Sequence, residues 1–462
     1  MVRTSWLSRA AAILTLVGCT SSTPASKLQD SATTADSSVT TEDSSAPLVP
    51  ALAFGERPRN ILLISIDTLA RNSVGLYGGG AATPFLDALG GAGFTLDQHA
   101  AASSWTLPGM TSIVTGRDVE ELPYLPRLQD DMTALPPIPE GTVTLAQTLA
   151  DNGYQTACVS TVNFFGRTYG TVAGCNTFTI AADDAATVAA TTLDQFDSAA
   201  VGGAEPWFLH THFKDPHAPY WPPEAYREGL DAYGEFSWDW SNEQDMSMSA
   251  GAWQSGTTEE RARIEGAMGF LYAAEIRYLD DTLRDMLAEL DSRGELADTL
   301  VVVVSDHGEA FWEHNFRGHA GSVYTEENTA LALFSAPTLA PGQWSAPTNQ
   351  RDLAPTILDA VGLAVPTDFT GAVVGTAERS RPVFAWVWPA NQPPLQSVRI
   401  DDERLIYSWN GRKELYDLSV DPGERIDIYD DRSAAELWDA LLPRVELLDG
   451  MIDEFIPTNP GL

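Results

Sequence analysis

Two short runs of apolar residues constrain the fold of this chain more than any other feature. Residues 60–66 read NILLISI and residues 300–304 read LVVVV. Near-continuous apolar runs of this length are typical of strands that are buried on both faces of a sheet. The first run ends at Asp67 and the second is followed by Asp306 and His307. Because ligand sites of open α/β sheets lie off the carboxyl ends of the strands, these side chains are the first indication of a shared site.

Helical patterns separate and follow these two runs. Residues 260–293 carry apolar side chains at helical spacing, and Gly294 is placed to end the helix. We expect this helix to cover one face of the sheet. Residues 151–160 predict a helix end followed by a strand through Cys158, and residues 351–361 predict a further helix that ends at Gly362. Strands that alternate with helices predict an α/β fold.

The C-terminal part of the chain has a different pattern. Short alternating runs at 382–388, 397–409 and 412–418 are separated by polar turns, which predicts a small antiparallel sheet. Residues 433–455 then predict a closing helix. We expect a catalytic domain over residues 58–375 and a C-terminal subdomain over residues 376–462.

The N-terminus resembles an export signal. Two arginines precede an apolar stretch that is too short to cross a bilayer, and the stretch ends in LVGC at Cys19. We interpret residues 1–19 as a lipoprotein signal peptide and Cys19 as the acylated residue; an ordinary signal peptide is the alternative. Residues 20–57 are rich in Ser, Thr, Ala and Asp and predict a disordered linker. The expected location is the periplasm or the cell surface, with attachment to the membrane by the N-terminal lipid only.

Two cysteines remain once Cys19 is set aside. In an exported chain, Cys158 and Cys175 predict one disulfide, and two buried thiols are the alternative.

The charge of the chain limits its partners. The formal net charge is −37, from 64 acidic and 27 basic residues. A nucleic-acid-binding protein needs a basic face, so we expect no nucleic-acid partner. An anionic substrate would also be repelled at long range. A site for such a substrate must therefore be positive locally, through a metal ion, a helix N-terminus or arginines.

The histidines gather in two short segments. Six of the seven histidines lie at positions 210, 212 and 217 and at positions 307, 314 and 319. Asp67, Asp306 and His307 together offer two carboxylates and an imidazole. This set suits one divalent cation, and Mn²⁺, Zn²⁺, Mg²⁺ and Ca²⁺ all remain open.

The segment SSWTLPGMTSIVTGR, residues 103–117, predicts a turn followed by a short helix that Gly116 ends. Thr106 stands at the start of this helix, two residues before Pro108. Its hydroxyl either caps the helix or acts as a nucleophile that a metal ion activates. The free N–H groups of the first turn could hold an incoming oxyanion. The local sequence leaves both roles open.

Seven segments in order resemble the sulfatase family of the alkaline-phosphatase superfamily. They are NILLISIDTL, SSWTLPGMTSIVTGR, HFKDPHAPY, AAEIRYLDDTL, VVVVSDHGE, GHAG and KELYDLSVDPGE. The resemblance implies a large mixed sheet flanked by helices, with a small C-terminal antiparallel-sheet subdomain. It implies that Asp67, Asp306 and His307 bind the metal and that Thr106 occupies the nucleophile position. His217 and His319 would contact the transferred group or the leaving group.

The chain departs from the sulfatase pattern at the nucleophile. The family makes formylglycine from Cys or Ser in a Cys-x-Pro-x-Arg motif, whereas residues 106–110 read TLPGM and retain only Pro108. Oxidation of a threonine would give a ketone, so formylglycine is not expected. We predict a metal-dependent hydrolase of phosphoric or sulfuric esters, with phosphoesters favoured and a small-molecule, glycan or lipid ester as substrate. The alternative is a catalytically degenerate lipoprotein that binds a glycan or another partner.

Overall fold

The computed structural model describes residues 51–122, 135–390, 392–430 and 433–455. The predicted signal peptide, Cys19 and most of the predicted linker lie outside these residues. Among the described helices, none is both long and apolar enough to cross a membrane.

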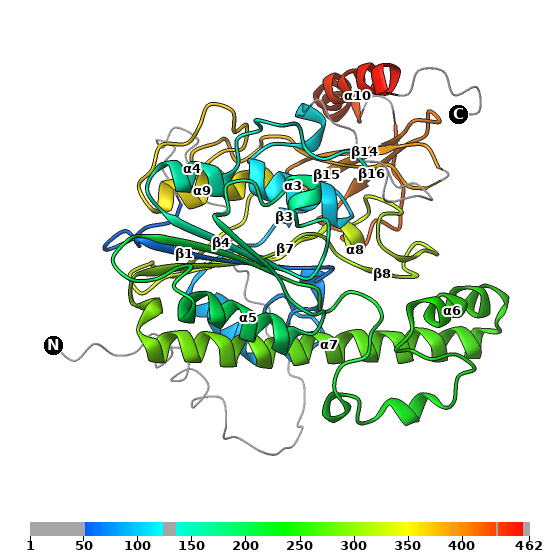
Figure 1. Cartoon of the computed structure of the whole chain (residues 1–462). Coiled ribbons are helices and arrows are strands. Elements are labelled where there is room, and N and C mark those ends of the chain that lie inside the picture. The colour runs from blue at the N-terminus through cyan, green and yellow to red at the C-terminus, as the bar shows by residue number, and fades with distance from the viewer. Residues whose placement is uncertain (1–50, 123–134, 391, 431–432, 456–462) are drawn as a thin grey trace, which may run out of the picture.

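A mixed eight-stranded sheet forms the centre of the molecule (Figure 1). Its strand order is β11-β2-β10-β7-β1-β6-β4-β5. The five strands from β7 to β5 run parallel, and β10 is antiparallel to both of its neighbours, β7 and β2. The bounds are β1 Asn60–Ile66, β2 Phe94–Leu96, β4 Gln155–Ser160, β5 Thr177–Ile180, β6 Trp207–Phe213, β7 Thr299–Ser305, β10 Ala332–Ser335 and β11 Gly342–Trp344.

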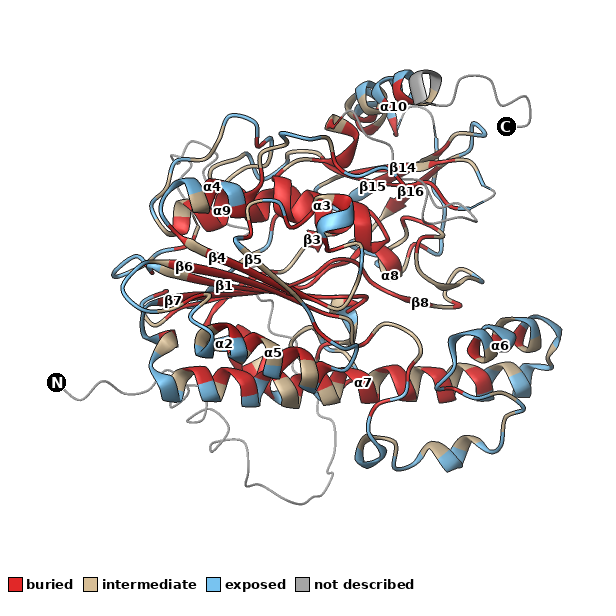
Figure 2. Cartoon of the chain, viewed as in Figure 1, coloured by how far each residue is buried: buried red, intermediate tan, exposed pale blue. Residues whose placement is uncertain are grey.

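Helices cover both faces of this sheet (Figures 1 and 2). One layer contains α2 Pro84–Ala92, α5 Ala185–Asp197 and α7 Thr258–Arg293, and the other contains α3 Thr106–Thr115, α4 Leu145–Asp151 and α9 Leu353–Ala360. Alternate residues of β1 enter the two cores: Leu62 and Ile64 pack with the α7 layer, and Ile61 and Leu63 pack with the α3 layer. This explains why the strand sequences are apolar at nearly every position.

The C-terminal residues form a separate antiparallel sheet in the order β13-β14-β15-β16. Its strands are Val383–Val387, Leu395–Ile400, Glu403–Ser408 and Lys413–Asp417, and α10 Ala435–Phe455 packs on it through Leu437 and Leu441. The remaining elements are α6 Glu243–Ser255, α8 Thr325–Asn328 and the short pairs β3 His99–Ala100 with β12 Thr348–Asn349 and β8 Ala310–Phe311 with β9 Arg317–Gly318. The predicted fold class is confirmed. The division at residue 375 stays a prediction.

The predicted helix ends and the predicted disulfide are also present. Gly294 and Gly116 adopt left-handed conformations, with φ of 83° and 61°, directly after α7 and α3. Cys158 of β4 is bonded to Cys175, which lies 17 residues further on.

A buried group of charges joins α10 to the α3 layer. Asp118 follows α3, and its carboxylate accepts from Arg351 at 2.6 Å and pairs with Arg444 of α10 at 3.0 Å. Arg444 also contacts Glu121 at 2.7 Å. The Asp118 and Arg351 side chains are 2% and 9% exposed. Because these charges have lost most of their water, each depends on the others.

We expect Arg351→Ala to lower the free energy of unfolding by about 3 kcal/mol, since it removes one of the two arginines that pair with the buried Asp118 carboxylate and leaves Arg444 and the amide of Asn349. Chemical denaturation monitored by circular dichroism measures this value. The control is Arg284→Ala, which breaks exposed pairs with Asp281 and Asp285 and should cost less than about 1 kcal/mol. Equal losses in the two variants would show that the buried group is not a special source of stability.

Candidate active site

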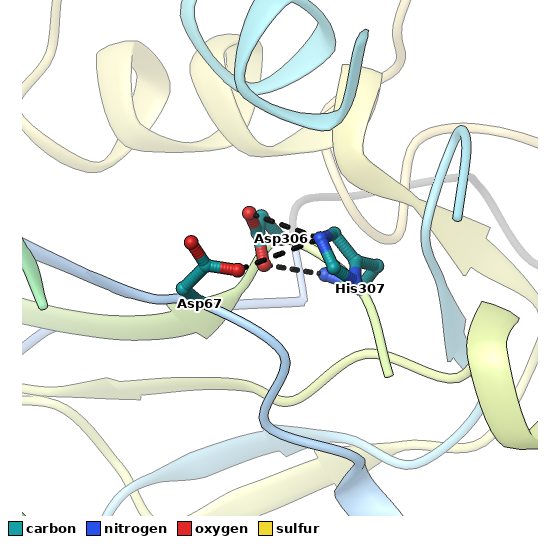
Figure 3. Close-up of side chains that lie close together, drawn as sticks. All are labelled: Asp67, Asp306 and His307. Carbon is teal, nitrogen blue, oxygen red and sulfur yellow. Dashed lines mark hydrogen bonds and ion pairs between the residues drawn. The ribbon is translucent and has the colours of Figure 1, made fainter. Parts of the chain in front are cut away.

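The candidate metal ligands meet at the carboxyl edge of the sheet. Asp67 follows β1, and Asp306 and His307 follow β7. The two strands are parallel neighbours whose last residues are paired, so the acids that follow them come together. His307 Nε2 lies 3.5 Å from Asp67 Oδ1 and 3.5 Å from Asp306 Oδ2 (Figure 3). The structure therefore brings together all three residues that we predicted as ligands.

Their donor atoms suit a divalent cation. One ligand atom from each residue lies within 4.8 Å of the others, and all three residues are buried. Asp67 Oδ1 and Asp306 Oδ2, the oxygens that face His307 Nε2, have no hydrogen-bond partner among the described residues. Buried carboxylate oxygens without partners are costly, and a cation would satisfy both. Asp67, Asp306 and His307 could therefore hold one divalent metal ion.

The protonation of the three residues reflects the crowding of two acids. Burial raises the pKa of Asp306 well above its ordinary value, and the charge of Asp67 raises it further. Burial also acts to raise the pKa of Asp67, but nearby histidines, His217 foremost, hold it below the ordinary value. Burial lowers the pKa of His307 to about 3, so its imidazole is neutral, the form that binds metals.

Backbone contacts fix the orientation of these ligands. Asp306 Oδ1 accepts from the N–H of Thr68 at 3.1 Å and from the N–H of His307 at 2.8 Å. His307 Nδ1 donates to the carbonyl of Gly308 at 2.9 Å, which leaves Nε2 free to face the acids. Gln350 Nε2 donates to the carbonyl of Asp306. These four contacts orient the Asp306 carboxylate and the His307 imidazole. None of them uses Asp306 Oδ2 or His307 Nε2, the atoms that would bind a metal.

Thr68 adopts an unusual backbone conformation next to Asp67. Its φ is 55°, in the left-handed region that β-branched residues rarely occupy. The hydroxyl of Tyr272 donates to the Thr68 carbonyl at 2.6 Å, and the Thr68 N–H donates to Asp306. Strained residues of this kind persist where surrounding contacts hold them, and they concentrate at functional sites.

Thr106 lies beside the three ligands. It is the first residue of α3, and Trp105 is the N-cap. Thr106 Oγ1 lies 3.4 Å from His307 Nε2, and the residue is 4% exposed. Gly109 permits this close approach of α3, because a Cβ atom at that position would lie 2.8 Å from the carbonyl oxygen of Asp306. The Thr106 hydroxyl thus faces the candidate metal ligands. Thr106 is not the N-cap residue of the helix, because Trp105 holds that position.

His217 and His319 complete the set of predicted site residues. The His319 ring centroid is 4.7 Å from that of His307 and 5.0 Å from that of His217. His319 Nδ1 lies 3.2 Å from Oε1 of the buried Glu309. Burial acts against the imidazolium, but the charge of Glu309 prevails and raises the pKa of His319 to about 9. His319 can therefore serve as a proton donor near neutral pH.

Several residues of the site were not predicted. Ser65 Oγ contacts His210 Nε2 and His212 Nδ1, each at 2.9 Å, and His212 Nε2 lies 3.7 Å from Asp67 Oδ2. Glu309 and Gln350 were missed as well. The spacing of His210 and His212 on one buried strand was the available signal, since both side chains lie on the same face.

Three other candidates lie elsewhere or are already paired. His314 contacts Glu326 at 2.6 Å and stacks on Tyr324, so it joins α8 instead of the ligand set. His99 pairs with Thr348 at 3.0 Å. Lys214, which follows the strand that carries His210 and His212, is paired with Asp183 at 2.9 Å.

The large mixed sheet and the ligands at its carboxyl edge define an alkaline-phosphatase-like α/β protein. The family model named Sulfatase matches residues 59–363, about two thirds of the chain. The chain belongs to the sulfatase family.

The curated relatives match only parts of their own length. A choline-sulfatase of Rhizobium meliloti is 29% identical over 241 residues, which is 47% of this chain and 45% of that protein. An arylsulfatase of Clostridium perfringens is 24% identical over 52% of each chain. The multifunctional alkaline phosphatase superfamily protein PehA of Trinickia caryophylli is 32% identical over 25% of this chain and 23% of its own. The chain thus spans about half the length of the first two relatives.

Solved structures share the fold over most of the chain. A protein in complex with its substrate D-glucosamine-2-N,6-O-disulfate has a TM-score of 0.68 at 18% identity, covering 87% of this chain and 99% of its own. The phosphonate monoester hydrolase of Silicibacter pomeroyi has a TM-score of 0.65 at 20% identity, covering 85% and 95%. At these identities the likeness establishes the fold alone.

We expect the purified chain to bind one divalent metal ion and Asp306→Asn to lower its affinity by at least about 100-fold, since a neutral amide replaces a charged ligand. Asparagine retains Oδ1 for the N–H groups of Thr68 and His307, so the fold should survive. Metal content after dialysis, measured by mass spectrometry, tests this.

The matched control is Asp280→Asn. Asp280 is a buried acid that accepts from the N–H groups of Phe85 and Leu86 on α2. This variant should retain the metal. Equal metal content in the wild type and in Asp306→Asn would place the metal site elsewhere.

Proposed function

We propose that the chain is a metal-dependent hydrolase of phosphoric or sulfuric esters, with phosphoesters favoured and Thr106 as the nucleophile. The observation that carries the proposal is the position of Thr106 Oγ1, 3.4 Å from His307 Nε2 and at the start of α3. A hydroxyl beside candidate metal ligands can lose its proton more readily, and a helix N-terminus attracts anions. Thr106 is therefore suited to attack an anionic ester. The substrate is a small-molecule, glycan or lipid ester.

The residues around Thr106 supply the other parts of the reaction. A divalent ion held by Asp67, Asp306 and His307 would stabilise negative charge and favour loss of the Thr106 proton. The first-turn N–H groups of α3 lack partners within the helix and can bind oxygens of the transferred group. His319, which Glu309 keeps protonated, can give its proton to the leaving oxygen. His217 Nδ1 donates to the carbonyl of Ala218 at 2.6 Å, so Nε2 is free to accept a proton.

The proposed reaction has two steps. Thr106 Oγ forms a bond to phosphorus as the bond to the leaving oxygen breaks, and this oxygen leaves as an alcohol. Water then attacks phosphorus and gives a proton to His319, which lost its own proton in the first step. The bond to Thr106 breaks, Thr106 Oγ takes back the proton held by His217, and the second product is released. This course resembles that of enzymes which use a covalent intermediate to divide one difficult displacement into two easier ones.

The residue at the nucleophile position is the reason that phosphoesters are favoured over sulfate esters. Thr106 replaces the formylglycine precursor, and Met110 replaces the arginine of the family motif. The fold neighbours include a phosphonate monoester hydrolase, and PehA is described as multifunctional. The other relatives named above are sulfatases, so a sulfate ester belongs in every assay.

We expect Thr106→Ala to abolish turnover while metal binding remains, because the nucleophilic hydroxyl is lost and the three ligands are intact. Thr106→Ser should retain part of the rate, since it keeps the hydroxyl. The measurement is turnover of bis-(p-nitrophenyl) phosphate and of p-nitrophenyl sulfate by each purified variant, corrected for folded protein and metal content.

The matched control is Thr111→Ala in the same helix. The Thr111 hydroxyl donates to the Leu107 carbonyl at 2.7 Å and is buried. Its loss should cost about 1 kcal/mol of stability and leave the rate per folded molecule nearly unchanged. Full activity in Thr106→Ala would exclude the nucleophile role, and a preference for the sulfate would exclude the phosphoester assignment. Metal binding without any turnover would favour the non-catalytic alternative.

We also propose that the chain is exported and anchored by lipid at Cys19. The support is the LVGC motif after a short apolar run and the polar linker that follows. Intact-mass analysis of the protein from its host should give a mature chain that begins at Cys19 and carries acyl chains. A mature chain that begins at another residue would exclude the lipoprotein assignment.

A further inference from the structure

The charges at the candidate active site cancel before any substrate enters. Asp67 and Asp306 carry two negative charges, which a divalent cation would balance. Glu309 and His319 form a close pair at 3.2 Å, whose net charge is zero wherever the shared proton lies. The neutral imidazole of His307 and the hydroxyl of Thr106 add nothing, and neither does His217 in its proposed role as a proton acceptor. A singly charged ester would therefore bring one uncompensated negative charge into a chain whose net charge is already −37.

Arg317 is a positive charge close to this set. It lies on β9, and in the register of the β8–β9 pair it stands opposite Phe311. Directly opposite residues have side chains on the same face, so the Arg317 and Phe311 side chains share one face of the hairpin. The Phe311 ring packs against Tyr220, with centroids 5.9 Å apart. Tyr220 follows His217 by three residues and is fully buried.

The hairpin also connects Arg317 to His319. Only Gly318 separates the two residues, and its φ of 100° turns the chain at a conformation that favours glycine. Burial keeps the pKa of the Tyr220 hydroxyl well above its ordinary value, the charge of Glu309 raises it further, and the charge of Arg317 acts to lower it. Arg317 thus lies close to Tyr220, on the segment that carries His217, and two residues before His319.

Arg317 has no carboxylate partner among the described residues. Its Nε atom is buried and without a hydrogen bond in the described part of the chain. The other nearby cations differ: Lys214 is paired with Asp183. Arg227 also has a buried Nε atom without a hydrogen bond, but its guanidinium stacks 3.8 Å above the Trp221 ring and its charge acts on Glu275. An arginine that is partly buried and lacks an acid is expected to have an anionic ligand.

We propose that Arg317 binds the anionic group of the substrate and selects esters with a single negative charge. Such esters are phosphodiesters, phosphonate monoesters and sulfate monoesters. One arginine balances one charge at this otherwise neutral site, whereas a phosphate monoester, with about two negative charges at neutral pH, would leave one charge unbalanced in a buried place. This inference rests on the proposed function and names the substrate class of the same site.

The experiment compares Arg317→Gln, Arg317→Lys and the control Arg263→Gln with the wild-type, metal-loaded chain at pH 7.5. Arg263 donates to the carbonyl of Glu235 at 3.0 Å and lies over Phe236, so its loss removes the same charge away from the site. The first readout is the dissociation constant of dimethyl phosphate, a singly charged ester, by calorimetry. The second is kcat/KM for bis-(p-nitrophenyl) phosphate, p-nitrophenyl sulfate and p-nitrophenyl phosphate. Circular dichroism and metal content verify each variant.

We expect Arg317→Gln to weaken dimethyl phosphate binding by at least about tenfold, since a charge-assisted contact is lost. Arg317→Lys should lose less because it keeps the charge, and Arg263→Gln should bind like the wild type. The wild type should prefer both singly charged esters to p-nitrophenyl phosphate, and Arg317→Gln should narrow that preference.

Equal binding of dimethyl phosphate by the wild type and Arg317→Gln would overturn the inference, as would no binding by the wild type or a preference for p-nitrophenyl phosphate. The two proposals fail separately. Binding that depends on Arg317 without turnover of any ester would remove the hydrolase and leave the anion contact. Turnover that does not depend on Arg317 would support the hydrolase and exclude Arg317 as the anion contact.

Discussion

Two buried carboxylates that face each other are the constraint on which the rest of the site depends. Asp67 and Asp306 meet because β1 and β7 are adjacent, parallel and in register. Burial raises the pKa of Asp306 well above its ordinary value, and repulsion by Asp67 raises it further. The N–H groups of Thr68 and His307, the amide of Gln350 and the close approach of α3 at Gly109 all hold Asp306 in place. These contacts leave Asp306 Oδ2, the oxygen that faces His307, for a cation.

The C-terminal helix α10 helps to hold Asp306 in place indirectly, through other residues. Gln350, which holds the Asp306 carbonyl, precedes Arg351 directly. Arg351 belongs to the buried charge group that also contains Asp118 and Arg444 of α10. The segment that orients a metal ligand is therefore anchored by the closing helix of the chain. This gives α10 a structural reason to pack where it does, beyond the apolar area that it covers.

The sequence was most informative where a local pattern determines the outcome. The apolar runs of β1 and β7 placed Asp67, Asp306 and His307, because parallel strands end at the same edge of the sheet. The spacing in α7 and the glycine after it predicted a long helix with its correct end. Contacts between distant segments left no such pattern. Ser65 meets His210 and His212 across strands, and Gln350 reaches Asp306 from a segment 44 residues away. Polar contacts of this kind depend on tertiary packing, which periodicity does not encode.

The replacement of the family nucleophile is consistent with the packing beneath it. In the sulfatase motif an arginine stands four residues after the formylglycine precursor, and here that position is Met110. Met110 is fully buried in the apolar core that contains Ile61, Leu63 and Val302. An arginine among these side chains would be a buried charge with no acid beside it, which is strongly unfavourable. Met110 and Thr106 lie on one helix. At the position of the motif arginine this chain has apolar packing, and the Thr106 hydroxyl lies 3.4 Å from His307 Nε2. The helix thus approaches the candidate metal ligands closely, and its first residue offers them the chemistry of an alcohol.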